Sequence, residues 1–462
     1  MTEINFNTYQ SAFSWRYGSD QMRQLFSEIN RRKTWRKVWT AIARVQHKAG
    51  LLTKAEFLDI RDNSQKIDIE KAHEIEAEIK HDLMAELKTF AAQSKIGGGK
   101  IHLGATSQDI EDNADAIILL SALEIIETEL KQALAEFSKK ISEYKELVCM
   151  AYTHLQPAEP TTLGYRFTLY AQDLLIDLQL LNFVKENVKG KGTKGAVGTY
   201  ASYVALLGSK AKNFEEDVMS ELGIEAFDVT GQVYPRKLDF LILSLLSSIA
   251  QSASKFAFDL RIMQSAGFGE WMEPFGKKQV GSSAMPFKRN PITAEKICSL
   301  ARYVASLTKV SWDNAANSLL ERTLDDSASR RIVLPDAFLA TNEILLSTKS
   351  IVSGLVINQK NIEKNLENFG PFAAIELILL ESTKRGADRQ EMHEVLREHA
   401  LVAYEFNNRL GTNPLFENLK KDEKITKYLN SKDIDKLSDY KTHIGLAKEK
   451  CEILLQKIKK AA

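Results

Sequence analysis

The stretch GSSAMPFKRNP, residues 281–291, holds more reactive side chains than a short loop usually does. It offers hydroxyls, two cations and an amide, at Ser282, Ser283, Lys288, Arg289 and Asn290. A Gly-Ser run by itself is more often a flexible linker. Asn290 and Pro291, however, are typical of an N-cap followed by the first residue of a helix, so the positive end of a helix dipole is expected to face the loop. Together these groups favour a negatively charged substrate.

The sequence on both sides of this loop is patterned for long helices. A helix is expected from Pro291 to about residue 320, and another over 236–266, bracketed by Pro235 and Gly267. Residues 111–148 contain neither Pro nor Gly, and their apolar side chains recur at helical spacing, at Leu119, Leu123, Ile126, Leu130, Phe137, Ile141 and Tyr144. That segment predicts one helix of roughly 50 Å. Helices this long need neighbours along their whole length, which favours an all-α protein that oligomerises through a helical bundle.

Length and composition limit the class of protein. A chain of 462 residues predicts two or three domains. The formal net charge of +1 gives no electrostatic argument for a nucleic-acid partner or a membrane surface. The start, MTEINFNTYQ, lacks a signal pattern, and no apolar run reaches the roughly 18 residues of a membrane span, so we expect a cytoplasmic protein. Cys149, Cys298 and Cys451 are scattered without CxxC spacing, as is typical of reduced thiols.

The motifs resemble those of one enzyme superfamily. Residues 281–290 match at every fixed position the pattern Gly-Ser-x-x-Met-x-x-Lys-x-Asn of the fumarase/aspartase superfamily of lyases. Among its branches the chain most resembles the adenylosuccinate lyases, over about residues 15–346. The supporting segments are KHDLMAEL (80–87), HLGATSQD (102–109), THLQPAEPTTLG (153–164), KGAVGT (194–199), TGQVYPRK (230–237) and ERTLDDSASRR (321–331).

The resemblance implies an architecture and a reaction. It implies an all-α homotetramer of three-domain subunits, with an N-terminal helical domain (1–110), a central bundle (111–356) that forms the tetrameric core, and a C-terminal helical domain (357–462). The implied reaction is β-elimination of fumarate from a succinylated purine nucleotide, which needs an acid, a base and a carboxylate-binding group. No metal or other cofactor is expected, and the sequence contains no HExxH, Walker loop or GxGxxG motif after a strand.

The resemblance also implies catalytic roles. Ser282 matches the base, and Ser283 is the alternative hydroxyl. Lys288 and Asn290 would bind the succinyl carboxylate and supply part of a positive environment. His154 matches the acid that protonates the departing nitrogen, although a histidine beside a proline turn is more often structural. Glu295 matches the carboxylate that orients this histidine.

Substrate-binding positions follow from the same segments. They are Arg16, Tyr17, Lys80, His81, Asp82, His102, Thr106, Ser107, Gln232, Lys296, Arg322, Ser327 and Arg331. His81 is the stronger candidate for phosphate contact, and His102 has a structural alternative. Thr106 and Ser107 precede an expected helix start, so simple N-capping is a second explanation for them. Ser327 and Arg331 are four residues apart and share a helical face, while a solvated charged face is the alternative. Asp325 and Asp326 are expected to be acids at a helix start.

Three positions depart from the sequence pattern of the family. Phe287 stands where many bacterial relatives have His, so no proton-transfer role can be assigned to this position. Lys80 and Lys296 stand where Arg is common, and lysine cannot reproduce a bidentate guanidinium contact.

Two alternative functions stay open. They are another fumarate-releasing lyase, similar to argininosuccinate lyase, and a catalytically silent helical assembly protein.

Overall fold

A computed structural model describes residues 7–461 of the chain, apart from the side chain of Asn408. The first six residues, which belong to the stretch considered for a targeting signal, lie outside the described residues. Within the described residues the chain is predominantly helical with four short strands, which confirms the all-α fold class. It divides into two compact units. The proposed boundaries at residues 110 and 356 stay a prediction.

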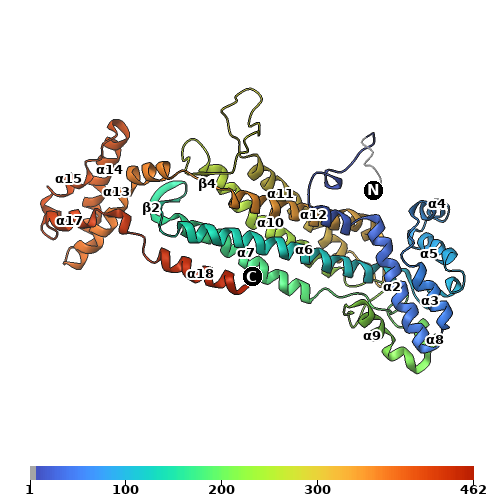
Figure 1. Ribbon diagram of the computed structural model, residues 1–462. Coiled ribbons are helices and arrows are strands. Elements are labelled where there is room, and N and C mark those ends of the chain that lie inside the picture. The colour runs from blue at the N-terminus through green and yellow to red at the C-terminus, as the bar shows by residue number, and fades with distance from the viewer. Residues whose placement is uncertain (1–6, 462) are drawn as a thin grey trace. The chain divides into compact units, whose positions relative to one another are not determined.

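The first unit comprises the chain through Lys131, Ile176–Ser254 and Lys296–Ser347. Its shorter elements are η1 (Ala12–Ser14), α1 (Asp20–Leu25), α2 (Glu28–Ala49), α3 (Lys54–Asn63), α4 (Ile69–Ile79), α5 (Asp82–Gln93), η2 (Gly98–Lys100), α8 (Ala201–Leu207), η3 (Gly208–Lys210) and α9 (Ala211–Leu222). Figure 1 shows α2 beside α3 and α9.

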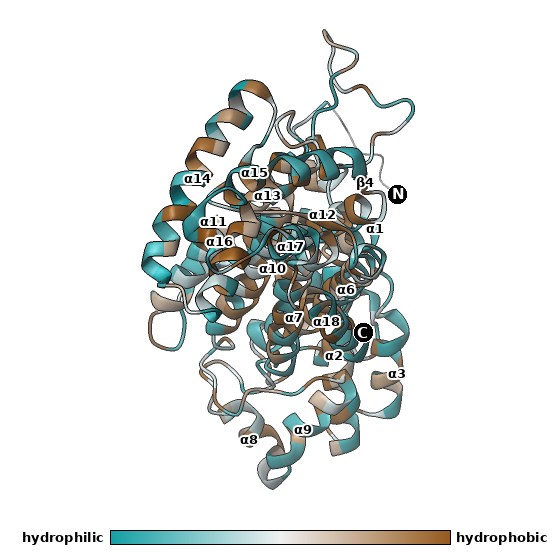
Figure 2. Ribbon diagram, turned by 90° about the vertical axis from the view of Figure 1, so that its left-hand side faces the viewer, coloured by the Kyte–Doolittle hydropathy of each residue, from teal (hydrophilic) through white to brown (hydrophobic). Residues whose placement is uncertain are grey.

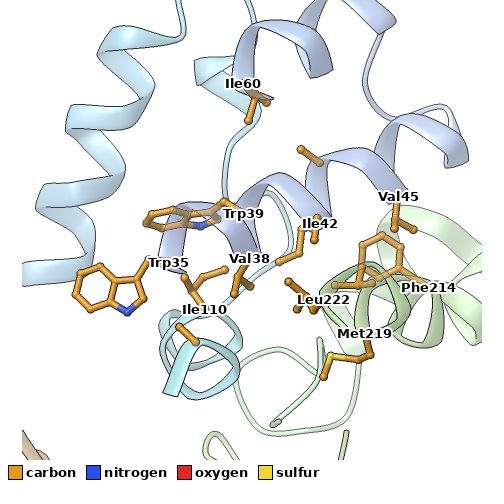
Figure 3. Close-up of a cluster of buried hydrophobic side chains, with 14 of the residues drawn as sticks. Trp35, Val38, Trp39, Ile42, Val45, Ile60, Ile110, Phe214, Met219 and Leu222 are labelled. Carbon is orange, nitrogen blue, oxygen red and sulfur yellow. The ribbon is translucent and has the colours of Figure 1, made fainter. Parts of the chain in front are cut away.

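Helix α2 is bounded by caps and organised around one apolar face. The Ser27 hydroxyl accepts from the backbone N–H of Asn30 at its start, and Gly50 ends it with φ 89°, a conformation that favours glycine. The buried face packs against α9 and the start of α6, in the cluster that Figure 3 shows around Trp39, Ile110 and Phe214.

A buried charge cluster joins α2 to α5. Glu86 is fully buried and accepts from Arg32 Nη1 at 2.8 Å and from Arg36 Nε at 2.6 Å. One carboxylate therefore pairs with two guanidinium groups, and removing it would leave uncompensated buried charge. This cluster fixes α5, and with it the His81–Asp82 segment, against α2.

Five long helices contribute residues to both units. They are α6 (Ser107–Tyr144), α7 (Leu163–Glu186), α10 (Lys237–Met263), α11 (Ile292–Ala316) and α12 (Asp325–Ser353). Two of the predicted helices lie close to their expected limits. The 111–148 prediction is wrong at both ends, because the helix begins at Ser107 and Val148 starts a strand. The sequence directly after Tyr144 contains no Gly or Pro that would mark the end of the helix. The helix ends there because the residues that follow pair as a strand.

Helix α10 has the length and composition of a membrane span. Of its most apolar window, 56% is buried within the fold. Core helices of soluble proteins pass the same test of length and hydropathy. The buried positions include Leu238, Ile242, Leu245 and Ile249, which are members of the predicted apolar stripe.

The second unit comprises Gln132–Leu175, Lys255–Glu295 and the chain from Thr348. Strands β1 (Val148–Thr153) and β2 (Gln156–Thr162) form an antiparallel hairpin, and β3 (Trp271–Met272) pairs with β4 (Val356–Ile357). The helices and 3₁₀ turn that follow are α13 (Gln359–Lys384), α14 (Arg389–Leu410), α15 (Leu415–Leu419), α16 (Glu423–Thr426), α17 (Ser431–Leu437), η4 (Tyr440–Thr442) and α18 (Ala447–Ala461).

Helix α13 links the hairpin to the C-terminal helices. It contacts both β1 and β2, and it lies beside α14. A hydrophobic core formed from α13 to α17 includes Ile378, Leu396 and Ile425. Figure 2 shows hydrophobic as well as polar residues along α14, of which Leu401, Val402 and Phe406 remain exposed.

Candidate active site

The loop that carries the signature motif is closed at its base. The Asn290 side-chain amide donates a hydrogen bond of 2.9 Å to the carbonyl oxygen of Gly281. A Cβ atom on residue 281 would lie 2.1 Å from the carbonyl oxygen of Lys288, which is too close for any side chain. The motif therefore requires Gly and Asn at its two ends for a structural reason, because these residues bring the two ends of the loop together.

The Ser282 hydroxyl is oriented by the same loop. Its Oγ accepts from the backbone N–H of Met285 at 3.1 Å and of Ala284 at 3.4 Å. Two N–H donors directed at one oxygen would stabilise negative charge there, as a serine base requires. Ser283 is exposed. Lys288 is exposed too, and its side chain has no hydrogen bond or ion pair within residues 7–461.

The expected N-cap at Asn290 is wrong. Helix α11 begins at Ile292, and its first N–H groups are accepted by the carboxylate of Glu273, from Thr293 at 3.1 Å and from Ala294 at 2.9 Å. Asn290 is instead committed to Gly281. Because Glu273 is buried, the positive end of this helix is already matched by a carboxylate. A substrate anion therefore does not find a free helix end here.

His154 lies at the tip of the β1–β2 hairpin. Thr153 pairs with Gln156, so His154 and Leu155 form a two-residue turn, and both have positive φ, 55° and 59°. Such turns usually contain Asn or Gly, since a side chain in this conformation costs roughly 1–2 kcal/mol. Strain of this kind clusters at functional sites, and His154 is exposed at the tip.

The hairpin is anchored by a buried carboxylate. Glu270 is fully buried and accepts from Tyr152 at 3.3 Å, from Arg166 at 3.3 Å and from Asn365 at 3.0 Å. Burial and the negative charge of Glu270 raise the pKa of Tyr152, so its hydroxyl remains a donor. These hydrogen bonds hold the strand next to the strained turn in place.

The structure does not pair His154 with Glu295 within one chain. Both side chains are exposed, and neither has a hydrogen bond or ion pair to another of the described residues. Glu295 lies in the first turn of α11, as expected. The proposed orientation of the histidine by this carboxylate stays a prediction.

In the first unit, three predicted binding residues converge on a cavity. Arg322, Ser327 and Arg331 line a cavity of about 70 Å³. Ser327 and Arg331 share a face of α12, as the spacing predicted, and Asp325 and Asp326 begin that helix. Arg322 Nη1 lies 3.0 Å from Asp326 Oδ1, and Arg331 Nη2 lies 2.6 Å from Asp82 Oδ2. A ligand anion must therefore compete with carboxylates for both guanidinium groups.

Lys80, His81 and Asp82 form the junction between α4 and α5. Lys80 ends α4 in the left-handed region, and His81 caps α5 by accepting from Met84 N–H at 3.4 Å. Burial opposes ionisation of Asp82, but Arg331 and the Leu83 N–H outweigh it and hold the pKa of Asp82 below its ordinary value. Asp82 is thus a charged partner of Arg331, which places this segment beside the cavity-lining helix.

His102 has a hydrogen-bond partner in the fold, which agrees with its structural alternative. Its Nδ1 atom accepts from the indole N–H of Trp39 at 3.0 Å. Burial lowers the pKa of His102, which favours the neutral ring. At the start of α6, Thr106 N–H donates to the carboxylate of Asp109 at 3.0 Å, and Ser107 is the first helical residue. Asp109 also accepts from the Lys194 and Gly195 N–H groups, so it joins the KGAVGT segment to α6.

The remaining predicted binding residues lie elsewhere in the first unit. Arg16 is exposed, with its guanidinium within 6 Å of the rings of Trp15 and Tyr17. Lys296 donates to Glu343 at 2.6 Å, and Glu343 also accepts from the Gly18 N–H at 3.0 Å, which ties Lys296 to the Arg16–Tyr17 segment. The backbone N–H of Gln232 donates to the carbonyl of Glu321, next to Arg322.

Sequence reasoning missed several residues that line the cavity, among them Trp35, Gln108, Glu111 and Arg330. Spacing could have found three of them. Gln108 and Glu111 are three apart on α6, followed by Asp115, and Arg330 adjoins Arg331 on α12. On α6 the helical period was applied to apolar residues alone, and the same period in its polar residues marks this second face.

The two groups of predicted residues fall in different units. The five proposed catalytic residues belong to the second unit, and the thirteen proposed binding residues belong to the first. The catalytic and binding roles of these residues stay predictions.

One group in the described chain has the composition of a metal site. Glu159, Glu376 and His443 place potential ligand atoms within 4.8 Å of one another. Both carboxylates are exposed, and exposed acidic groups are common without an ion. A hydrogen bond donated to Glu376, then burial, raises the pKa of Glu159, as expected for two carboxyl groups that share a proton.

Comparison with solved structures establishes the fold class. Fumarate lyase from Mesorhizobium sp. BNC1 superposes with a TM-score of 0.85 at 21% identity, over 97% of this chain and 99% of that one. A 3-carboxy-cis,cis-muconate lactonizing enzyme from Pseudomonas putida gives 0.86 at 22% identity, over 98% and 100%. At these identities the likeness concerns the fold. A family model described as a lyase matches residues 16–305, so fold and signature loop together define a lyase.

The relatives narrow this class. A second family model, described as the C-terminus of adenylosuccinate lyase, matches residues 371–453. The adenylosuccinate lyase of Saccharomyces cerevisiae is 40% identical over 98% of this chain and 95% of the relative. That of Archaeoglobus fulgidus is 36% identical over 95% and 96%. The chain therefore belongs to the adenylosuccinate lyase family.

Proposed function

We propose that the protein cleaves adenylosuccinate to AMP and fumarate, and the succinyl-aminoimidazole-carboxamide ribotide of purine synthesis to its aminoimidazole product and fumarate. The observation that carries this proposal is the closed signature loop. It retains every fixed position of the motif and directs two N–H groups at Ser282, in a chain 40% identical to an adenylosuccinate lyase. The protein is expected to work in the cytoplasm, without a metal or other cofactor.

The proposed mechanism divides proton transfer between two residues. Ser282 Oγ, in its ionised form, removes a proton from the succinyl carbon next to the one that bears nitrogen and becomes a neutral hydroxyl. The electron pair forms the double bond of fumarate as the carbon–nitrogen bond breaks, and His154 protonates the departing nitrogen. Lys288 binds the carboxylate on which negative charge accumulates. Asn290 contributes through the second N–H of its amide, because the first is bound to Gly281.

The binding residues would hold the nucleotide. Arg322, Ser327 and Arg331 present two guanidinium groups and a hydroxyl to one cavity, which suits a phosphate group. Arg16, Tyr17 and Lys296 are connected through Glu343 and supply a second group of contacts.

We also propose that the active form is a homotetramer. On α7, Ile176, Leu180 and Phe183 recur at helical spacing and are exposed. Such a face needs a partner, and a second copy of the same helix is a suitable one. Exposed His154 and Glu295 would then find their partners on another subunit.

The test is an ultraviolet assay with purified protein and adenylosuccinate, followed by identification of AMP and fumarate. Turnover after dialysis against a strong chelator would support the metal-free mechanism. A protein that binds AMP but does not release fumarate from either succinyl substrate would contradict the proposed function. The same assay with argininosuccinate separates this function from that of the related branch.

A further inference from the structure

The cavity lined by Arg322, Ser327 and Arg331 also contains Glu111, a carboxyl group with no role in the reaction proposed above. Glu111 lies in the first turns of α6, one turn after Ser107. Its side chain accepts a hydrogen bond from the amide of Gln108, which is a neutral partner. It forms no ion pair with any of the described residues. An ionised carboxylate so close to several guanidinium groups would ordinarily be paired with one of them.

The arginines around Glu111 are already matched by other carboxylates. Five arginines line the cavity, and each has a carboxylate oxygen within 4 Å: Arg31 with Glu28, Arg236 with Asp112 and Asp326, Arg322 with Asp326, Arg330 with Asp239 and Asp115, and Arg331 with Asp82. Ionised Glu111 would add a negative charge that no unpaired lining arginine is there to neutralise. That negative charge would repel a ligand anion that enters the cavity.

The electrostatic surroundings agree with a neutral Glu111. Burial, and then the charges of Asp82, Asp115 and Asp112, raise the pKa of Glu111 to about 8, against the opposite effect of Arg331. The acids come from α5 and from α6 itself, and the arginines come from α2, α12 and the segments that precede α10 and α12. At neutral pH the group is therefore a carboxylic acid, which has one O–H to donate.

A second observation is a buried hydrogen-bond donor in the cavity lining that has no acceptor. The indole N–H of Trp35 belongs to a cavity-lining side chain that is 3% exposed, and it has no hydrogen-bond partner among the described residues. Figure 3 shows Trp35 at the edge of the hydrophobic cluster. A buried donor without an acceptor is costly, and a ligand oxygen would satisfy it.

We propose that Glu111 is a further binding residue of this cavity: its protonated carboxyl donates a hydrogen bond to an anionic oxygen of the ligand that Arg322, Ser327 and Arg331 hold, and loss of the proton makes the cavity reject that ligand. The inference rests on the proposed function for the identity of the ligand, a nucleoside monophosphate. Phosphate monoesters lose their second proton near pH 6, so above pH 7 the ligand is a dianion throughout. Any further change of affinity with pH then belongs to the protein.

The experiment compares wild type, Glu111→Gln, Glu111→Ala and the control Glu124→Gln, each as the full chain. Glu124 is an exposed carboxylate on the same helix that does not line the cavity. The KM for adenylosuccinate and the Kd for AMP, by calorimetry, are measured between pH 7 and 9.5. In wild type and Glu124→Gln both constants should rise about tenfold per pH unit above pH 8, since only the protonated form binds. In Glu111→Gln, which keeps a donor without a charge, the rise should be less than twofold.

The Glu111→Ala variant separates the effect of the hydrogen-bond donor from the effect of the negative charge. It should also lose the alkaline rise, but its Kd at pH 7 should exceed that of Glu111→Gln by about tenfold, because the donor is missing. An alkaline rise in Glu111→Gln equal to that of wild type would overturn the proposal. So would equal affinities of the Ala and Gln variants at pH 7. If wild type binds AMP with this pH dependence yet turns over no succinyl substrate, the proposed reaction fails while the role of Glu111 stands.

Discussion

The side-chain amide of Asn290 holds the carbonyl of Gly281 at 2.9 Å and closes the loop that carries Ser282. The two residues are the outermost fixed positions of the signature motif. Their contact explains why the motif begins with Gly and ends with Asn, and it makes the position of Ser282 dependent on the geometry at the base of the loop.

Replacing Gly281 by Ala should disable the enzyme without unfolding it. The added methyl group would lie 2.1 Å from the Lys288 carbonyl, so the loop must open. A shift of about 1 Å at the base can cost about 10² in kcat. The control is Gly276→Ala, where the nearest atom is 3.6 Å away. Steady-state kinetics and thermal melting of both variants test this, and a fully active Gly281→Ala enzyme would show that loop closure is dispensable.

Ser282→Ala and His154→Asn should each lower kcat by about 10² or more, because each removes one proton-transfer group. Asn is chosen for position 154 because it tolerates the positive φ of the hairpin turn. Ser283→Ala and Leu155→Gly are the matched controls, and both should keep most activity. Leu155→Gly should also raise the melting temperature, since it relieves turn strain. Near-normal turnover by Ser282→Ala would remove this serine from the mechanism.

Mixed tetramers should recover activity from two inactive proteins. If each active site draws His154 and Ser282 from different subunits, some sites in a hybrid of His154→Ala and Ser282→Ala chains contain both intact residues. The two variants are unfolded together, refolded and assayed, and native mass spectrometry verifies the hybrid. Each variant refolded alone must stay inactive. Confirmed hybrids that remain inactive would mean that one chain supplies both residues to a site.

Arg322→Met and Arg331→Met should weaken substrate binding by about 1.5–3 kcal/mol, the range for a hydrogen bond to a charged group. Asp326 and Asp82 also lose these cationic partners, so their charges repel the substrate anion and add to the loss. Arg409→Met, an exposed position on α14, is the control. Unchanged kinetics together with a large drop in melting temperature would assign these arginines a structural role.

Glu111→Gln should stabilise the protein more at high pH than at low pH. In the unfolded chain Glu111 ionises near its ordinary pKa of 4.5, whereas the folded chain holds the proton up to a pKa of about 8. The unfolded state therefore gains from ionisation as pH rises between these values, and the cost to folding is complete above pH 8. The gain in melting temperature of Glu111→Gln over wild type should be larger at pH 9 than at pH 5. An equal gain at both pH values, or one matched by Glu124→Gln, would contradict the raised pKa.

Local patterns predicted much of this protein. The apolar period of three and four residues predicted α10, α11 and most of α6, because a long helix must bury one face along its whole length. The same period placed Ser327 and Arg331 on one face of α12, and both line the cavity. The strand at Val148 was missed because its stability depends on pairing with β2, a contact that no local signal announces.

The sequence by itself determined the helical class, the family motif and the residue types available for chemistry, because these depend on composition and on spacing within one element. Tertiary structure alone decided which groups those residues meet. Glu273, rather than Asn290, caps α11, since a carboxylate buried against the helix start matches its N–H groups better than a side chain committed to Gly281. Asp82 pairs with Arg331 across 249 residues, and burial together with three neighbouring acids from two helices raises the pKa of Glu111. Such pairings depend on distances between elements, which the order of residues along the chain does not specify.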